Sequence, residues 1–519
     1  MASSQQHARM EFLLELRRRA KTYLNPTETR LPFQGEEEEE LCVLPHTTAA
    51  DTRERRALSS SNIEKGSRVF SNAPSSWVLH AEHLNSHCSA CCRTFIDKDL
   101  FPSSQCGSCK MVKYCSRACQ VLDWRTGGHS AECKHIAIYH KKLNNNALND
   151  LRLLVRTYSV AYSQSSKKRK CHVICRFGAG QVIECGLRHL NRLSPAAGAE
   201  EFGHVFDGTP AQDETMITLE QAAYILSQEG EENVNFNKLL FLLAAFRTNN
   251  FGIVDDLFTV VASAVYPSAA ILNHSCLPNT VLVYERGRPG SAPIVHGIYL
   301  GNGGSEELTH SYCDVTKPLV LRRRHLLQTH GFFCTCLRCT EQAEAATAVW
   351  TEDEEKLAES LSHAASRPLE LRALLPQLSS SCSSSSSSSS SPLIRQHALV
   401  ERLSTDRSSP FEYGRYQTKC RSLEEALVEG DIVAAVSACE QIVCCLSLFF
   451  SHLDFHPLLG LQLFTLGDLY RACEGREHEA EEIYAWCKDI LSFTHTQIGS
   501  DLLQRLEESS APAPSYSQD

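Results

Sequence analysis

Three motifs that contain cysteine hold the residues of this chain best suited to binding metal. The first combines Cys88-x2-Cys91, Cys106-x2-Cys109, Cys115-x3-Cys119 and His129-x3-Cys133, the second is Asn273-His274-Ser275-Cys276, and the third is Cys334-x-Cys336-x2-Cys339. Zinc takes four thiolate or imidazole ligands at tetrahedral corners, and a Cys-x2-Cys turn presents two of them to one ion. The first motif therefore predicts two zinc sites, and the other two together supply four thiolates for a third.

The N-terminal sequence indicates the cellular compartment in which these cysteines are found. The chain has 519 residues and 24 cysteines, and it begins Met-Ala-Ser-Ser-Gln-Gln, without the basic and apolar segments of a secretory signal. No apolar run reaches the roughly 18 residues of a membrane span. We therefore expect an intracellular protein, cytoplasmic and nuclear, whose reduced cysteines bind metal and which makes no membrane contact. Lys167–Lys170 could be a nuclear localisation signal or a solvated basic loop.

The net charge of −10 disfavours DNA as a partner of the whole chain. A nucleic-acid binder led by the first cysteine motif is accordingly the weakest of the functional hypotheses. Binding of that kind would collapse as salt is added, because it depends on phosphate contacts.

Apolar patterning divides the chain into segments that must position these motifs. Ile63–Phe70 reads as a turn followed by a strand, and Leu239, Leu240, Leu243 and Phe246 share one helical face. The stretch Ser379–Ser391 is nearly all serine and is expected to be a disordered linker. Three helical stripes follow, at Val436/Cys439/Val443/Leu446, Leu459/Leu463/Leu466/Tyr470 and Ile483/Cys487/Ile490/Leu491, with Gly475 between the last two. Antiparallel helix pairs of this length suggest a tetratricopeptide-like array.

The first motif resembles the MYND zinc finger. The likeness includes Tyr114-Cys115-Ser116, Gln120, and Trp124 ahead of His129. In that family the ligand pairs interleave, which implies one zinc held by Cys88, Cys91, Cys115 and Cys119 and another held by Cys106, Cys109, His129 and Cys133. Cys92 could compete with its neighbour Cys91, although the spacing favours Cys91. MYND fingers bind proteins, so the resemblance implies a proline-rich peptide as a possible partner, with DNA contact unlikely.

The other two motifs resemble parts of SET-domain methyltransferases. Tyr266–Asn279 is similar to the knot motif, and Glu307–Asp314 is similar to the motif that carries the catalytic tyrosine. Phe332–Cys339 resembles the post-SET element, where Cys276 joins Cys334, Cys336 and Cys339 around one zinc. A finger inserted early in such a domain, with Phe455-His456-Pro457 in a helical C-terminal part, resembles the SET and MYND domain-containing (SMYD) lysine methyltransferases.

The resemblance implies an α+β fold: a SET-domain β-fold interrupted by a MYND zinc finger, then a post-SET zinc site and a C-terminal α-helical, tetratricopeptide-like domain. The expected segments are a flexible leader (1–50), the N-terminal part of the SET domain (51–87), the finger (88–133), a largely helical insertion (134–260), the core SET region (261–326), the post-SET zinc region (327–345), a helical segment with the serine-rich linker (346–410), the C-terminal helical domain (411–508) and a disordered tail (509–519).

The implied function is protein-lysine N-methylation with S-adenosylmethionine, on histones or other proteins, supported by three zinc ions. By resemblance, Tyr312 is catalytic and orients the amine beside the transferring methyl group. Asn273 and His274 would hold the cofactor, Phe332 would stack on its adenine, and Asn249 would lie near it, although Asn250 could take that role. Tyr266 either lines the lysine channel or packs in the core.

The chain departs from the SET pattern at the segment expected to approach the cofactor. Upstream of Ile63-Glu64-Lys65-Gly66 lies Arg55-Arg56-Ala57-Leu58-Ser59, without the usual glycines, and Ser305 and His310 replace a glycine and an apolar residue. Glycine there lets the backbone come close to a ligand. The alternative hypothesis is therefore a catalytically weak or inactive zinc-binding scaffold that recruits protein partners.

Overall fold

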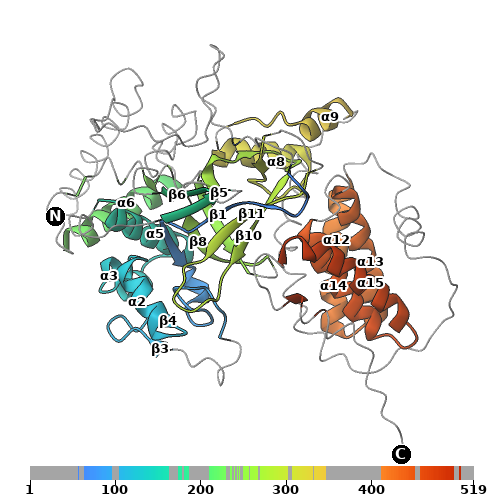
Figure 1. The fold of residues 1–519 in the computed structure, drawn as a ribbon, viewed down its shortest axis with the longest axis horizontal. Coiled ribbons are helices and arrows are strands. Elements are labelled where there is room, and N and C mark those ends of the chain that lie inside the picture. The colour runs from blue at the N-terminus through green and yellow to red at the C-terminus, as the bar shows by residue number, and fades with distance from the viewer. Residues whose placement is uncertain are drawn as a thin grey trace, which may run out of the picture.

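A central β-structure joins a zinc-finger-like lobe to a bundle of C-terminal helices in the computed structural model of the chain (Figure 1). The residues that the structure describes are 57, 63–95, 104–162, 173–177, 181–185, 210–228, 234–235, 239, 242–243, 245, 249–255, 258–266, 269–301, 307–330, 332–345, 411–450, 456–495, 502–503 and 506. Within them, no helix is long and apolar enough to cross a membrane.

The larger sheet has five strands in the order β10-β11-β1-β5-β6, each antiparallel to its neighbours. These are β1 (Arg68–Asn72), β5 (Val173–Phe177), β6 (Gln181–Cys185), β10 (Thr280–Glu285) and β11 (Ile294–Tyr299). The predicted turn and strand at Ile63–Phe70 are confirmed, because Gly66 takes a φ of +85° and β1 begins two residues later. The Gly66 N–H donates to Tyr299 O at 2.7 Å, which fixes the turn against β11.

A second sheet shows that the finger-like lobe is an insertion in a continuous fold. Its strands are β2 (Ser76–Leu79), β8 (Val260–Val265) and β7 (Asn250–Val254), in the order β2-β8-β7. β2 precedes the lobe and β8 follows it by more than a hundred residues, yet Ser76 pairs with Val265. The lobe itself contains β3 (Ser104–Gln105), β4 (Lys113–Tyr114), α2 (Arg117–Arg125) and α3 (His129–Glu132).

The segment that follows the lobe supplies helices that pack against this second sheet. They are α4 (Ile136–Tyr139), α5 (Asn145–Tyr162) and α6 (Pro210–Gln228), and the apolar face of α5 shares a core with β2 and α6. The segment 134–260, expected to be largely helical, thus also contains β5, β6 and β7. Of the predicted helical face at 239–246, Leu239 and Leu243 are buried, whereas Leu240 and Phe246 lie outside the described residues.

Two short strands, β9 (Asn273–His274) and β12 (Thr309–His310), pair in parallel, and Asn273 lies opposite Thr309. The 3-10 turn η5 (Ala269–Ile271) leads into β9. Helices α8 (Leu319–His330) and α9 (Leu337–Ala345) follow β12, so that α8 spans the expected boundary between 326 and 327.

The C-terminal part is helical, as the sequence predicts. It contains α12 (Phe411–Glu429), α13 (Ile432–Phe449), α14 (Pro457–Arg471) and α15 (Glu477–Ser492), shown orange to red in Figure 1. The three predicted stripes are confirmed as buried faces, with Ile483 alone partly exposed. The bundle is joined to the sheet, because Val283 and Ile298 belong to its core and the Phe493 ring fills the space beside Gly66. The leader, Ser379–Ser391, Lys167–Lys170 and the tail lie outside the described residues.

Candidate metal centres and the adjoining cleft

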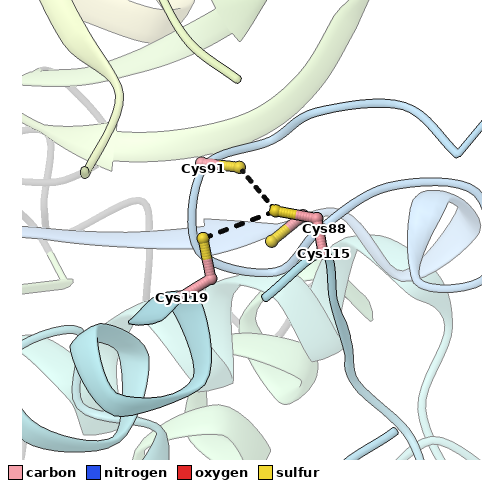
Figure 2. A group of neighbouring side chains, drawn as sticks. All are labelled: Cys88, Cys91, Cys115 and Cys119. Atoms are coloured by element: carbon pink, nitrogen blue, oxygen red, sulfur yellow. Dashed lines mark hydrogen bonds between the residues drawn. The ribbon is translucent and has the colours of Figure 1, made fainter. Parts of the chain in front are cut away.

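Cys88, Cys91, Cys115 and Cys119 form the first candidate metal centre, and Figure 2 shows their sulfurs pointing toward one another. The Sγ atoms of Cys91 and Cys115 are 3.6 Å apart, as are those of Cys115 and Cys119. Ser116 caps α2 by accepting a hydrogen bond from the Cys119 N–H, which places Cys119 one turn after Cys115. Cys92, buried with a φ of 58°, stays outside the group, and this favours Cys91 as the ligand.

Cys106, Cys109, His129 and Cys133 form the second centre. The Cys106 and Cys133 sulfurs are 3.7 Å apart, and His129 Nε2 lies 3.6 Å from Cys109 Sγ. His129 Nδ1 lies 3.1 Å from a Glu132 oxygen, which can only accept, so this contact assigns the proton to Nδ1 and leaves Nε2 free to bind metal. Both sets match the interleaved pairing that the resemblance implies.

A buried ionic network holds the second centre against the β2 strand. Arg156 donates to Asp123 at 2.7 Å and to Glu132 at 2.6 Å, and Arg152 donates to Glu132 at 3.1 Å. Both arginines also donate to the backbone of β2, at Trp77 O and Leu79 O. Burial by itself would raise the pKa of Glu132, but the two guanidiniums hold that pKa well below its usual range. The carboxylate that orients His129 therefore stays charged.

Cys276, Cys334, Cys336 and Cys339 form the third centre, with Cys276 Sγ 3.5 Å from Cys339 Sγ and 4.0 Å from Cys334 Sγ. All four are free thiols. Four thiolates around Zn²⁺ carry a net charge of −2, which a buried site must offset. The fully buried Arg322 lies 3.5 Å from Cys339 Sγ, and Arg338 donates to Cys276 O, so the surroundings of the cluster fit a bound zinc.

The pairing of β9 with β12 brings Asn273 and His274 beside the segment that carries Tyr312. Asn273 Nδ2 donates to Glu307 Oε1 at 2.7 Å. His274 Nδ1 accepts from the Tyr312 N–H at 2.9 Å, and its Nε2 lies 3.2 Å from Cys276 Sγ. His274 therefore connects the third centre to the backbone of Tyr312.

Contacts to the hydroxyl and to the ring hold the Tyr312 side chain in place. Its hydroxyl donates to Leu272 O at 2.6 Å, and its ring lies 4.8 Å from the rings of His310 and His330. Burial, with a smaller contribution from Glu307, raises the pKa of Tyr312 to about 12. The hydroxyl is consequently neutral at physiological pH and acts through its position and hydrogen bonding.

A cleft of about 510 Å³ opens beside Tyr312, within the usual size of small-ligand sites. Among the predicted residues, Tyr312 and Asn249 line it, together with Asn250. Asn273, His274 and Phe332 are not part of its wall, although the His274 and Phe332 rings lie 5.3 Å and 6.4 Å from the Tyr312 ring. Tyr266 packs in the core, where its hydroxyl donates to Pro293 O.

The cleft wall also contains residues that the sequence did not single out as functional. They include four histidines, namely His310, His325, His330 and His456. Burial lowers the pKa of His310 to about 3, and lowers the pKa of His456 to about 3 as well. None of the described residues lining the cleft is Asp, Glu, Lys or Arg. The wall is therefore uncharged at neutral pH, a property that follows only when distant segments are brought together.

Ala57 is the one residue of the glycine-poor segment 55–59 that the structure describes. It is partly buried against the core of the two sheets, and its carbonyl accepts from the Leu308 N–H at 2.7 Å. Ala57 thus lies beside the residues that lead to β12. Arg55, Arg56 and Ser305 lie outside the described residues.

Comparison with known proteins matches residues 85–133 to the MYND finger family. N-lysine methyltransferase SMYD2 of Bos taurus is 28% identical over 278 residues, covering 54% of this chain and 56% of the relative. The human SMYD2 is 27% identical over 281 residues, with the same coverage. Histone-lysine N-methyltransferase ASHR1 of Arabidopsis thaliana is 23% identical over 497 residues, covering 89% of this chain and 95% of the relative. The chain thus spans little more than half the length of the SMYD2 relatives.

Proposed function

We propose that this chain, which belongs to the SET and MYND domain-containing (SMYD) family, is a protein-lysine N-methyltransferase that uses S-adenosylmethionine. The observation that carries the proposal is the placement of Tyr312 at the wall of an uncharged cleft, with its backbone tied through His274 to a four-thiol metal centre. The printed names of the relatives support the same reaction class.

The reaction requires a neutral amine, whereas free lysine has a pKa of about 10.4. A wall without charged side chains disfavours the ammonium form of an entering lysine, because that form loses solvation there. When bound, S-adenosylmethionine supplies a methyl group on a sulfonium centre. The protein then contributes mainly by holding the amine in line with that group.

Tyr312 is the residue proposed to orient the amine. Its hydroxyl already donates to Leu272 O, so an oxygen lone pair is left to accept from the amine N–H. Contacts with His310 and His330 limit the motion of its ring. Asn249 is proposed to contact the cofactor from the cleft wall. Asn273 and His274 are proposed to contact it from the knot motif, and Phe332 from the segment that leads into the third centre.

The three metal centres are proposed to hold structural zinc. Each offers four protein ligands and so leaves no open coordination position for catalysis. We further propose histone or other lysine-bearing proteins as substrates, a proline-rich peptide as a ligand of the finger, and a cytoplasmic and nuclear location.

Substitution Tyr312→Phe tests the proposal, because it removes the hydroxyl and keeps the ring. Transfer of a labelled methyl group from S-adenosylmethionine to a mixture of histones and lysate proteins is measured for the wild type, Tyr312→Phe and Tyr224→Phe. Tyr224 is an exposed residue of α6 that does not line the cleft, and it serves as the matched control. We expect Tyr312→Phe to lose transfer at least about 100-fold, as for a positioned catalytic group, and Tyr224→Phe to retain it. Equal transfer by all three proteins would contradict the assignment.

A further inference from the structure

A fifth thiol lies beside the third metal centre and is not needed for zinc. The sulfur of Cys313, the sulfur of Cys276 and a ring nitrogen of His274 all lie within 4.8 Å of one another. The four-thiol set around Cys276 is complete without Cys313. Cys313 is half-buried and follows Tyr312 directly in the chain.

Cys313 differs chemically from its neighbours. A thiolate bound to zinc shares its lone pair with the metal, whereas Cys313, outside the set, keeps its lone pair available for reaction. The Cys313 and Cys276 sulfurs lie within 4.8 Å of each other, and a disulfide bond is about 2.05 Å long. Rotation of the two side chains could therefore bring the sulfurs to bonding distance. Cys276 is also the ligand that comes from the knot, while the other three come from one short segment.

The position of Cys313 couples its chemistry to the cleft. Ser311 Oγ accepts from the Cys313 N–H and donates to Cys313 O at 2.6 Å, so the backbone on both sides of Tyr312 is tightly held. His274 joins the Tyr312 N–H to Cys276 Sγ. Any movement of Cys276 toward Cys313 therefore disturbs the contacts that position Tyr312.

We propose that Cys313 is a peroxide-reactive modification site that forms a disulfide with Cys276 and expels the third zinc. The Cys313 sulfur attacks one oxygen of hydrogen peroxide, the O–O bond breaks, and a sulfenic acid and water form. The Cys276 sulfur then leaves zinc and attacks the sulfenic sulfur, forming the S–S bond and releasing hydroxide, which takes a proton from solvent. The two sulfurs lose two electrons, and one peroxide becomes two water molecules.

Loss of Cys276 leaves the zinc with three ligands from Cys334, Cys336 and Cys339, so the ion is released to a competing chelator. A thiol reductant with added zinc reverses the change, because the product is a disulfide and not a higher oxide. The inference goes beyond the proposed function, since zinc release and disulfide formation are measured without any methyl transfer.

The test uses the full zinc-loaded chain as wild type, Cys313→Ser and Cys445→Ser. Cys445 is also half-buried, but it lies on α13 in the C-terminal bundle, so it is the matched control thiol. Each protein receives hydrogen peroxide, zinc release is followed with a metal-sensitive dye, and disulfide-linked peptides are mapped by mass spectrometry.

We expect the wild type and Cys445→Ser to release one zinc first, with a Cys276–Cys313 peptide pair, and to regain it after reduction. Cys313→Ser should release that zinc about tenfold more slowly, because the sulfurs that remain at the third centre are metal-bound. The proposal is overturned if Cys313→Ser releases zinc as fast as the wild type, or if the first disulfide excludes Cys313. It is overturned too if Cys313→Ser binds fewer than three zinc ions before oxidation, since Cys313 would then be a ligand.

Discussion

Replacing Arg156 by methionine should loosen the finger from the sheet. Arg156 is fully buried and contacts Asp123, Glu132 and the Trp77 and Gly127 carbonyls at 2.6–3.2 Å. Methionine retains much of the volume but removes the charge. Asp123 would keep the Tyr114 hydroxyl but lose its guanidinium partner, whereas Glu132 would keep Arg152. Removing one member of a buried ion pair costs about 3–5 kcal/mol, and the surviving Glu132–Arg152 pair places this case near the lower figure.

The assay is thermal unfolding of the zinc-loaded protein, followed by calorimetry. Because a chain of this size need not unfold in two states, the transition of the sheet and finger is the one compared. A loss of about 3 kcal/mol should lower that transition by roughly 6 °C or more. Arg288→Met is the matched control, since Arg288 is 71% exposed and pairs with Glu285 on the surface. Such a pair contributes about 0–1 kcal/mol.

The same variant should weaken zinc binding at the second centre. The network holds Glu132, which orients His129, and loss of such supporting contacts typically lowers metal affinity about 10–100-fold. Competition with a chelator measures this effect separately from the melt. A transition within about 2 °C of the wild type, with unchanged zinc affinity, would refute the reasoning.

Two further predictions concern the cleft and the bundle. The folded pKa of His310, about 3, lies below the unfolded value of 6.5, so the stability that the neutral ring contributes is intact above pH 6.5 and is lost as pH falls toward 3. Between pH 7.5 and pH 5 the wild type should therefore lose about 2 kcal/mol more free energy of unfolding than His310→Phe. In a melt, the melting temperature of His310→Phe should drop less over this range than that of the wild type. Gly467→Ala should destabilise the bundle by about 1–3 kcal/mol in a melt, because the new Cβ would lie 2.5 Å from the buried Tyr484 ring. Gly414 on α12 has open space beside it, so Gly414→Ala should instead stabilise the bundle by up to about 1 kcal/mol. Equal pH responses of the two proteins in the first case, or equal effects of the two alanines in the second, would contradict the respective arguments.

Local spacing made the pairs of candidate metal ligands predictable. Cys-x2-Cys and Cys-x3-Cys pairs are set by single turns, so their partners follow from chain positions alone, and the resemblance supplied the interleaving that the structure reproduces. The helical stripes at 436–491 were predictable for the same reason, because one period of the helix decides which face is buried. Spacing favoured Cys91 over Cys92, and the structure agrees, because Cys91 belongs to the first group of ligand atoms and Cys92 does not.

The cleft and the buried network were not predictable, because they depend on contacts between distant segments. His310, His330 and His456 come from β12, from α8 and from the residue before α14, and no short pattern links them. Arg152 and Arg156 read as ordinary polar positions of a helix, yet the fold buries both against Glu132. The strands within 134–260 were hidden for a related reason, since β5 pairs with β1, which precedes the finger, and β7 pairs with β8, which begins at Val260.

The measurement that tests the central claim most directly is calorimetric titration of the zinc-loaded protein with S-adenosylmethionine. Ala57, whose carbonyl binds the Leu308 N–H, stands in the segment expected to lie near the cofactor. The account predicts binding in the micromolar range, about −8 kcal/mol, with three zinc ions per chain. Absence of binding by a protein that holds three zinc ions and melts cooperatively would contradict it, and would leave a zinc-dependent protein scaffold as the function.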